Sequence, residues 1–426
     1  MQIIPFVDTG LGNSSYLVDL EDGDALAIDP GRDVAPYRQE AERRGRRITH
    51  SIETHLHADF VSGSRELATH GARVVAPFQA GLEFPHTGVG SGGEMDLGGL
   101  TLRALHTPGH TPEHLAYLLL DGGRPLALFS GGSLLVGGVA RTDLISPEQT
   151  EELTRELYRS IREHLLDLPD DLAVYPTHGA GSFCTAGGSE ERTTTIGRER
   201  ASHPLLSIED EETFVSTLLE GFGSYPLYFS RLREVNRRGP KVYGDRPPTL
   251  RSLAPDRVRH LMADGAELVD VRPTPQFAAG HVPGALSIAL RDSFASWLGW
   301  LAPHDRPVVF VLDQRQDRAE LVRQCLKIGY ESLAGELAGG MQAWRAAGLE
   351  ERVLALVEAR NLPTGTVLDV RQEDEFWSGH IPGATHVELG SLPEAAASLP
   401  GGSVTVYCSR GDRAMTGASL LERLGR

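Results

Sequence analysis

Apolar strands alternate with polar loops and helical segments in the second half of the chain, and this pattern occurs twice. A short apolar run that ends in Asp-Val-Arg lies at residues 267–272 and returns at residues 367–371. Each run is followed by a Gly-His-x-Pro-Gly-Ala segment, at residues 280–285 and 379–384, with the same spacing in both places. Such an internal repeat indicates two copies of one domain.

The order of elements within each copy predicts its fold. A second apolar run, at residues 307–312 in the first copy and 403–407 in the second, is followed by a helical pattern. Buried strands that alternate with helices are typical of a doubly wound α/β sheet. We therefore expect two such domains, over residues 246–350 (the first copy) and 351–426 (the second copy).

The first copy continues through a segment that has no counterpart in the second. Residues 337–344, which include Trp344, follow the second strand of the first copy, whereas the sequence reaches Arg426 before the matching position. We expect the last strand and helix of the second copy to be absent, and the edge of its sheet to be less well covered.

The first 200 residues show a different arrangement, in which short apolar strands are separated by Gly-rich turns, a few helices and His-bearing loops. The expected strands lie at residues 15–18, 25–28, 74–75, 100–102 and 115–118. This pattern favours a layered αββα sandwich. We expect two appended helices in residues 208–238 and a linker at residues 239–248, so the first domain is assigned to residues 1–245.

Composition narrows the range of partners. The 426 residues carry a net charge of −17, with 40% hydrophobic and 23% charged residues, as in a soluble multidomain protein. The acidic balance disfavours nucleic acid and anionic membranes, and no apolar run reaches the length of a membrane span. Three cysteines do not make a disulfide framework, and residues 1–6 do not resemble a secretory signal. We therefore expect a cytoplasmic protein.

One cysteine lies where a nucleophile is expected. The segment 408–413, Cys-Ser-Arg-Gly-Asp-Arg, lies between a strand and a predicted helix. A loop of this kind points backbone N–H groups toward one position at the helix N-terminus, which favours a thiolate on Cys408 and can hold an anionic persulfide. Arg410 and Arg413 offer bidentate sites to an anionic donor such as thiosulfate, and Gly411 allows the tight turn.

Two other interpretations of this loop follow from its residues. A cysteine at the end of a strand can be an ordinary packing residue, and a similar set of N–H groups serves phosphate ester chemistry. The short distance along the chain from Cys408 to Arg413 makes a small loop, which favours sulfur over a phosphate ester. Cys325 lies in the helix after the second strand of the first copy and is expected to be a packing residue.

Both copies resemble rhodanese domains, and the second retains the active-site loop of that family at Cys408, Gly411 and Arg413. In the first copy, Asp313 stands in place of the nucleophile and Gln316 in place of the turn glycine. A carboxylate cannot carry a persulfide. The resemblance therefore implies a sulfurtransferase in the second copy and a catalytically silent first copy that acts as a scaffold or docking surface.

Three histidine-bearing loops in the first domain indicate a metal centre. The segment Thr-His-Leu-His-Ala-Asp places His55, His57 and Asp59 directly after a predicted strand, at a spacing that suits a divalent metal. His110 lies in Thr-Pro-Gly-His-Thr, and His178 lies in Tyr-Pro-Thr-His-Gly. A single histidine is more often a surface or capping residue, but three such loops in this order predict one shared site.

These loops resemble those of the metallo-β-lactamase fold, over residues 1–240. Residues 12–18, 27–32 and 194–199 are most similar to the persulfide dioxygenase branch, which is known as a fusion with a silent and then an active rhodanese domain. The resemblance implies the oxidation of glutathione persulfide, or another low-molecular-weight persulfide, to sulfite by O₂ at one non-haem Fe(II).

The sequence departs from that family at two positions of the site. Phe60 stands where the family has a histidine, and Gly132 stands where it has the aspartate that completes the iron ligands. Of the ligands that the resemblance implies, His55 and His110 are present and the carboxylate is absent. The expected cofactor is one Fe(II) per chain, with zinc or no metal as alternatives.

Three accounts of this altered site remain open. In the first, His57 completes a three-histidine face with the two remaining ligands, and such a face is compatible with thiol oxygenation. In the second, the domain binds no functional metal and is a platform. In the third, Asp143 reaches the metal. A second metal would have only Asp59 and His178, which disfavours a binuclear hydrolase.

Three functional hypotheses follow. The first is an enzyme in which Cys408 moves sulfane sulfur between thiosulfate or a persulfide and a low-molecular-weight thiol. The second is a scaffold that holds a persulfide for a partner protein, and the third is a glyoxalase II-like thioester hydrolase, which the changes at positions 60 and 132 disfavour.

Cys184 is expected near the rim of the metal pocket, as a packing residue or a sulfur carrier. We expect small anionic sulfur donors and a thiol as partners, and a homo-oligomer.

Overall fold

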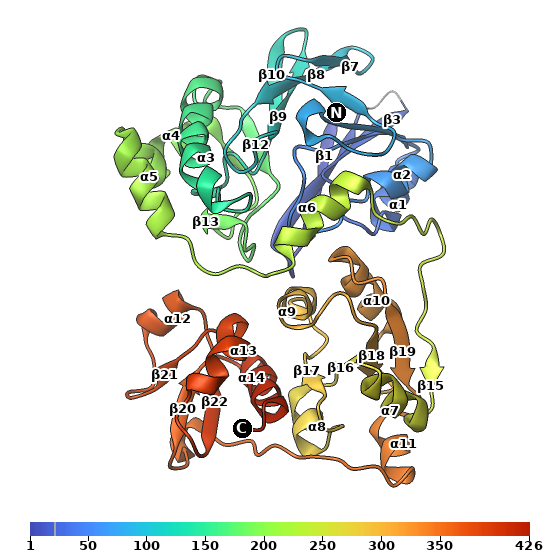
Figure 1. Ribbon diagram of the computed structural model, residues 1–426. Coiled ribbons are helices and arrows are strands. Elements are labelled where there is room, and N and C mark those ends of the chain that lie inside the picture. The colour runs from blue at the N-terminus through green and yellow to red at the C-terminus, as the bar shows by residue number, and fades with distance from the viewer. Residues whose placement is uncertain (21–22) are drawn as a thin grey trace. The chain divides into compact units, whose positions relative to one another are not determined.

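The structure is a computed structural model that describes residues 1–20 and 23–426. The chain divides into two compact units, one of Met1–Arg246 with Leu326–Gly329 and one of Pro247–Cys325 with Tyr330–Arg426. Residues 1–246 are coloured from blue to yellow-green in Figure 1, and residues 247–426 from yellow to red. The division falls within the segment that was expected to be a linker.

The first unit contains two six-stranded sheets. The strands of the first sheet are β1 (Gln2–Asp8), β2 (Asn13–Asp19), β3 (Asp24–Ile28), β4 (Arg47–Ile52), β5 (Arg73–Pro77) and β6 (Thr87–Val89), in the order β1-β2-β3-β4-β5-β6. Those of the second are β7 (Glu94–Asp96), β8 (Leu100–His106), β9 (Leu115–Asp121), β10 (Arg124–Gly131), β12 (Ala173–Pro176) and β14 (Thr194–Thr195), in the order β14-β12-β10-β9-β8-β7. A separate pair joins β11 (Gly138–Ala140) to β13 (Thr185–Gly187).

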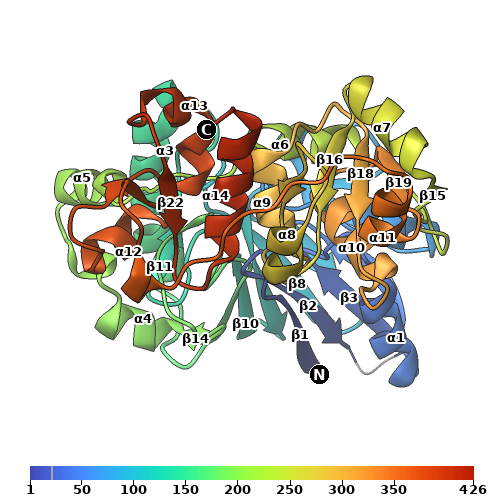
Figure 2. The ribbon, with the colours of Figure 1, turned by 90° about the horizontal axis from the view of Figure 1, so that it is seen from below.

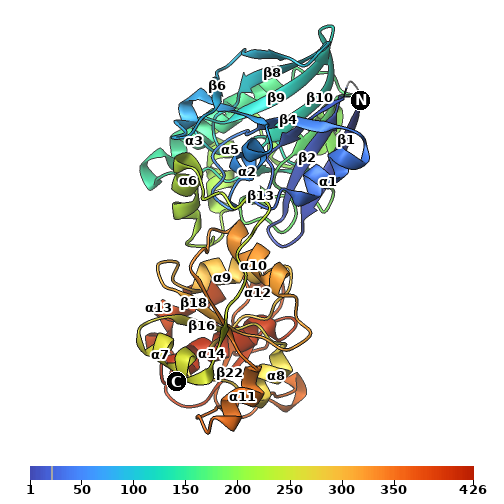
Figure 3. The ribbon, with the colours of Figure 1, turned by 90° about the vertical axis from the view of Figure 1, so that its right-hand side faces the viewer.

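Apolar side chains fix the layers of this unit. One cluster fills the space between the two sheets and includes Tyr16, Ile28, Leu102, Leu119 and Phe129. The helices are α1 (Ala35–Arg43), α2 (Ser64–Thr69), α3 (Pro147–Ser160), α4 (Ile196–Ser202), α5 (Glu211–Glu220) and α6 (Phe229–Arg238). Helices α1 and α2 pack on the outer face of the first sheet, and α3 and α5 on that of the second (Figure 3). This is the αββα sandwich expected from the sequence.

The second unit contains both copies of the repeat. The first copy has the strands β15 (Ser252–Leu253), β16 (Glu267–Asp270), β17 (Leu286–Ser287), β18 (Val308–Val311) and β19 (Leu333–Leu337), in the parallel order β15-β19-β18-β16-β17. Its helices are α7 (Pro255–Ala263), α8 (Thr274–Ala279), α9 (Phe294–Leu301), α10 (Arg318–Lys327) and α11 (Gly340–Ala346). The second copy has β20 (Thr366–Asp369), β21 (Thr385–His386) and β22 (Val404–Tyr407), in the parallel order β21-β20-β22, with α12 (Glu373–Ser378), α13 (Leu392–Ala395) and α14 (Asp412–Arg423).

Helix α14 belongs to the second copy but packs against both copies. It contacts β22 on one side and β17 and α8 on the other (Figure 2). Met415 joins the apolar cluster of the first copy, and the Thr416 hydroxyl donates to the carbonyl of Ser287 at 2.6 Å. The N–H of Ser287 donates to the Ser419 hydroxyl at 3.0 Å. The first copy therefore covers the helix, while β22 forms one edge of a three-stranded sheet.

The structure extends the elements predicted from apolar runs. β8 continues through Arg103 to His106 because it pairs with β9 over its whole length, which an apolar run alone does not reveal. β1 was not among the strands expected from the sequence, and Pro5 lies within it. Proline is tolerated there because β1 is an edge strand.

Among the described helices, none combines the length and the apolar character that crossing a membrane requires.

Candidate functional site

Cys408 lies at the start of the loop between β22 and α14. Its sulfur accepts hydrogen bonds from the backbone N–H groups of Gly411, at 3.1 Å, and Ala414, at 3.4 Å. Gly411 has a φ of 96°, a left-handed conformation that favours glycine, and this turn directs the N–H groups at the sulfur. Because Cys408 is partly exposed, an anionic sulfur there is both stabilised and accessible.

Arg413 is held beside this sulfur by an acidic partner. Its guanidinium forms bonds of 2.5 and 2.7 Å to the two carboxylate oxygens of Glu375 in α12, it donates to the Ser409 hydroxyl at 3.1 Å, and its charge interacts with the Cys408 sulfur. The hydrogen bonds from Arg413 lower the pKa of the Glu375 carboxyl. Glu375 therefore fixes the Arg413 guanidinium beside the loop, while Arg410 is exposed.

A cavity of about 440 Å³ adjoins the loop. The second copy contributes Arg410, Gly411 and Asp412 to its wall. The second copy also contributes Leu356, and the first copy contributes Val271, Pro273, Thr274, Pro275, Ala289, Leu290 and Gln316. The two copies therefore share the wall of this cavity, and Cys408 is not among its lining residues.

The first copy keeps the loop but not the nucleophile. Asp313 occupies the position of the cysteine, and its carboxylate accepts the N–H groups of Arg315, at 2.7 Å, and Gln316, at 3.1 Å. The Gln316 side chain, at the position of the turn glycine, donates to the carbonyl of Val271 at 2.6 Å. The anion-binding loop of this copy is therefore filled by its own carboxylate, and we call this copy silent.

In the first unit, the three histidine loops meet at the ends of strands. His55 follows β4, His110 follows β8 and His178 follows β12. One ligand atom from each of these residues lies within 4.8 Å of the others, and all three side chains are buried. From the sequence, we considered His57 as the third histidine of this face, whereas the structure places His178 there.

Hydrogen bonds orient each of these rings. In every case Nδ1 binds an oxygen of another residue, which leaves Nε2 as the ligand atom. The bonds join His55 to the Thr54 hydroxyl at 2.8 Å, His110 to the Arg141 carbonyl at 2.7 Å and His178 to the Asn13 amide oxygen at 3.1 Å. Within the described chain, the buried Nε2 atoms of His55 and His178 have no hydrogen-bond partner.

These rings are suited to hold a cation. Burial lowers the pKa of His55 and of His110 well below the ordinary value, so both rings are neutral. A neutral imidazole is the form that binds a metal. Since a buried polar atom without a partner costs free energy, the two orphaned Nε2 atoms fit a bound divalent metal ion.

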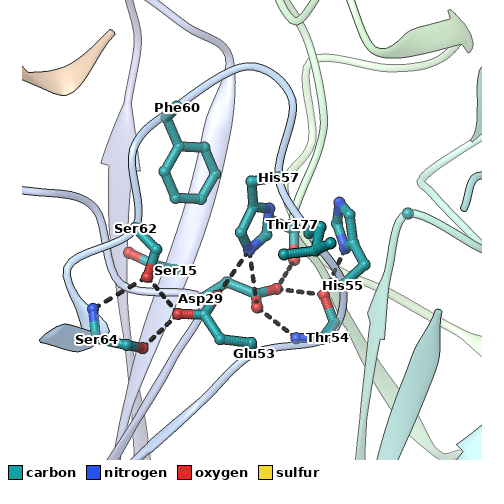
Figure 4. A network of polar contacts seen from close by, with 12 residues as sticks. Ser15, Asp29, Glu53, Thr54, His55, His57, Phe60, Ser62, Ser64 and Thr177 are labelled. Atoms are coloured by element: carbon teal, nitrogen blue, oxygen red, sulfur yellow. Dashed lines mark hydrogen bonds and ion pairs between the residues drawn. The ribbon is translucent and has the colours of Figure 1, made fainter. Parts of the chain in front are cut away.

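His57 is turned away from this face. Its Nε2 lies 3.1 Å from Glu53 and 3.2 Å from Asp29, and its ring stacks on Phe60 with centroids 4.2 Å apart (Figure 4). Burial lowers the pKa of His57, but the two carboxylates outweigh burial and raise it to about 10. The face considered from the sequence, with His57 as the third ligand, is therefore not what the structure shows.

A second group of ligand atoms adjoins the first. His57, Asp59 and His178 have ligand atoms within 4.8 Å of one another. Nδ1 of His57 and Oδ1 of Asp59 are buried and lack hydrogen-bond partners in the part of the chain that the structure describes. From the sequence, we expected only Asp59 and His178 as ligands of a second metal ion. The structure corrects this expectation, because His57 lies with them.

Two residues do not lie where we considered them from the sequence, which were the metal centre for Asp143 and the rim of its pocket for Cys184. Asp143 forms bonds of 2.6 and 2.7 Å with the Arg141 guanidinium, so it is not directed at the histidines. Cys184 is fully buried rather than at a pocket rim. Burial raises the pKa of its thiol well above the ordinary value, and Asp59 adds to the rise. Cys184 is therefore a packing residue beside Asp59.

Asp29 is a residue of the site that the sequence reasoning missed. It directly follows β3 and has a φ of 48°. Its buried carboxylate accepts the N–H and the hydroxyl of Thr54, both at 2.7 Å, and the Thr177 hydroxyl at 2.5 Å (Figure 4). Because Thr54 in turn orients His55, Asp29 positions a ligand ring. The sequence feature that could have indicated this role is a carboxylate directly after a predicted strand and directly before Pro-Gly.

Gly132 lies against a ligand ring. A Cβ atom at this position would be 2.5 Å from Cδ2 of His110. The N–H of Gly132 donates to Nε2 of His114 at 2.9 Å. Any side chain at position 132 therefore requires His110 to move, and the arrangement of this site depends on the glycine.

Replacing Gly132 with Ala is expected to lower the free energy of unfolding by about 1–3 kcal/mol, because the added methyl group overpacks a buried site. Gly90→Ala is the matched control, since a Cβ there meets nothing within 4 Å. Urea denaturation of the two variants measures the difference. Equal stability of Gly132→Ala and Gly90→Ala would contradict the close packing on His110.

Comparison with known proteins identifies both units. The rhodanese-like domain model matches residues 254–347 and 351–426, and the metallo-beta-lactamase superfamily model matches residues 8–178. The mitochondrial persulfide dioxygenase ETHE1 of Homo sapiens is 31% identical over 203 residues, which cover 46% of this chain and 73% of that protein. A hydroxyacylglutathione hydrolase of Rhodopseudomonas palustris (strain BisB18) is 36% identical over 250 residues, which cover 52% of this chain and 93% of that protein.

A solved structure matches a larger part of the chain. A metallo-beta-lactamase from Staphylococcus aureus has a TM-score of 0.69 at 29% identity, and the match covers 79% of this chain and 98% of that one. The chain belongs to the metallo-beta-lactamase superfamily, as a fusion of an N-terminal domain homologous to persulfide dioxygenases with rhodanese-like domains.

Proposed function

We propose that this chain is an enzyme of sulfane-sulfur metabolism with two active centres. Cys408 carries sulfur as a persulfide, and the N-terminal domain oxidises a low-molecular-weight persulfide with O₂ at an iron centre. The observation that carries the proposal is the pair of N–H groups, from Gly411 and Ala414, aimed at the Cys408 sulfur.

The reaction at Cys408 is a sulfur transfer in two steps. The Cys408 thiolate attacks the outer sulfur of thiosulfate, the S–S bond of the donor breaks and sulfite leaves with the electron pair of that bond. A low-molecular-weight thiolate then attacks the outer sulfur of the Cys408 persulfide and departs as a new persulfide, which returns Cys408 to the thiolate. Throughout, the N–H groups and Arg413 hold negative charge at this position.

The histidines of the first domain complete the proposal. His55, His110 and His178 would hold one Fe(II), with Asp29 and Thr54 keeping the first ring in place. Bound iron supplies a site where O₂ and the substrate sulfur meet. The balanced reaction consumes a persulfide, O₂ and water and yields the thiol, sulfite and two protons.

A second candidate for the first domain is thioester hydrolysis. The second ligand group, of His57, Asp59 and His178, favours it, because a metal ion held there, with His178 as its ligand, would lie beside one held by His55 and His110. The hydrolase relative from Rhodopseudomonas palustris also supports it. Metal-dependent cleavage of a glutathione thioester, with no persulfide-dependent uptake of O₂, would favour this candidate over the oxygenase.

Turnover distinguishes an enzyme from a scaffold. The whole chain, loaded with Fe(II) under anaerobic conditions, is supplied with thiosulfate and glutathione, and sulfite is measured over time. The proposal predicts many sulfite molecules per chain. A scaffold that only holds a persulfide would release one and stop, and that result would overturn the proposed sulfurtransferase. Uptake of O₂ with glutathione persulfide tests the iron centre separately.

A further inference from the structure

Side chains of the silent first copy hold the first residue of the helix that carries the Cys408 loop. Oδ1 of Asp412 accepts a hydrogen bond from the Thr274 hydroxyl at 3.0 Å. Oδ2 of Asp412 pairs with the Arg291 guanidinium at 2.7 Å. Thr274 begins α8, and Arg291 follows β17, so both partners belong to the first copy. The pair is only partly exposed, at 35% for the Arg291 side chain and 28% for that of Asp412.

The repeat provides an internal comparison for this aspartate. Asp317 occupies the matching position in the silent copy, and its carboxylate accepts the N–H groups of Ala319, at 2.8 Å, and Glu320, at 3.2 Å. In the silent copy, therefore, the aspartate caps its own helix. In the active copy the N–H that matches Ala319 is that of Ala414, and it donates to the Cys408 sulfur instead. Helix α14 has no side-chain cap.

The difference matters because the helix N-terminus is the anion-binding element of the site. A carboxylate that capped α14 would take the Ala414 N–H from the sulfur. It would also place a second negative charge beside the thiolate or persulfide of Cys408, which is unfavourable at short range. Arg291 offsets the charge of Asp412, and Thr274 fixes the carboxylate away from the loop.

We propose that Arg291 and Thr274 of the silent copy are positioning residues for sulfur transfer. They draw the Asp412 carboxylate away from the N-terminus of α14 and leave the backbone N–H groups to the anionic sulfur on Cys408. The silent copy thus completes the electrostatic environment of the active one. This inference rests on the proposed role of Cys408 and deepens it.

Alkylation of Cys408 by two reagents tests the inference without any turnover. Iodoacetate is an anion and iodoacetamide is neutral, so the ratio of their rates reports the local charge at the sulfur. Cys184 and Cys325 are buried, which makes Cys408 the cysteine that reacts in the native chain. In Arg291→Gln, we expect the iodoacetate-to-iodoacetamide ratio to fall about fivefold, because Asp412 returns to the helix N-terminus.

A second substitution separates electrostatic positioning from a merely structural role. Asp412→Asn in the Arg291→Gln background is expected to restore the ratio to within about twofold of the unmodified chain, because the returning charge is removed. Thr274→Val, which changes no charge, is expected to lower the ratio in the same direction. Unfolding midpoints of all variants report whether the unit stays folded.

Three results would overturn the inference. These are an unchanged ratio in Arg291→Gln, a parallel loss of both alkylation rates, and a ratio that Asp412→Asn does not restore. Failure of the proposed function is recognised differently, as an absence of sulfur transfer in the unmodified chain whatever its alkylation ratio.

Discussion

Cys408→Ser is expected to abolish sulfur transfer from thiosulfate to glutathione, with a loss of at least about a thousandfold. A serine hydroxyl is not ionised near neutral pH and cannot carry sulfane sulfur, whereas the thiolate both attacks the donor and stores the sulfur. The substitution changes one atom in a partly exposed loop, so we expect no measurable change in the unfolding midpoint. Sulfite release by the purified whole chain measures the effect.

Cys325→Ala is the matched control for this prediction. Its thiol is buried in α10, and burial raises the pKa of the thiol, so the residue contributes packing and no chemistry. The variant is expected to lose about 1 kcal/mol of stability and to keep its sulfur transfer. Retained transfer in Cys408→Ser would show that another group carries the sulfur.

His178→Ala is expected to weaken iron binding by at least about a hundredfold. The ligand atom of His178 lies within 4.8 Å of those of His55 and His110, and its buried Nε2 has no protein partner among the described residues. Removal of one of three protein ligands leaves too few to hold Fe(II) against its hydration. Iron content per chain after anaerobic loading, followed by gel filtration, measures the change.

The control for iron binding is His164→Ala, because His164 is exposed and lies outside the ligand groups. The unmodified chain and His164→Ala are both expected to retain close to one iron per chain. Full iron retention by His178→Ala would contradict the three-histidine face. A loss of iron from His57→Ala alone would instead assign the metal to the second ligand group.

Much of the second unit could be predicted from the sequence, because the residues that indicate its fold and its loop lie close together along the chain. The Cys408 loop lies between a strand and a helix, and the spacing of Cys408, Gly411 and Arg413 already implied convergent N–H groups. The absence of a cysteine from the loop of the first copy was also evident from the sequence, since Asp313 stands at that position. The structure adds that this carboxylate accepts the N–H groups that would otherwise bind an anionic sulfur.

The third ligand of the metal centre was not predictable from spacing. His57 is closer to His55 in sequence, and only the fold shows that Asp29 and Glu53 bind its Nε2 and turn it away. The role of His178 depends on how β12 aligns with β10 in the second sheet. Likewise, the contact of Arg291 with Asp412 joins distant parts of the chain that no local pattern connects.

The mass of the Cys408 peptide after brief exposure of the whole chain to thiosulfate tests the central claim most directly. Cys408 is predicted to gain one sulfur atom and to lose it again when glutathione is added, while Cys184 and Cys325 stay unmodified. If the peptide gains no sulfur, or keeps it in the presence of glutathione, Cys408 is not the sulfur carrier of this enzyme.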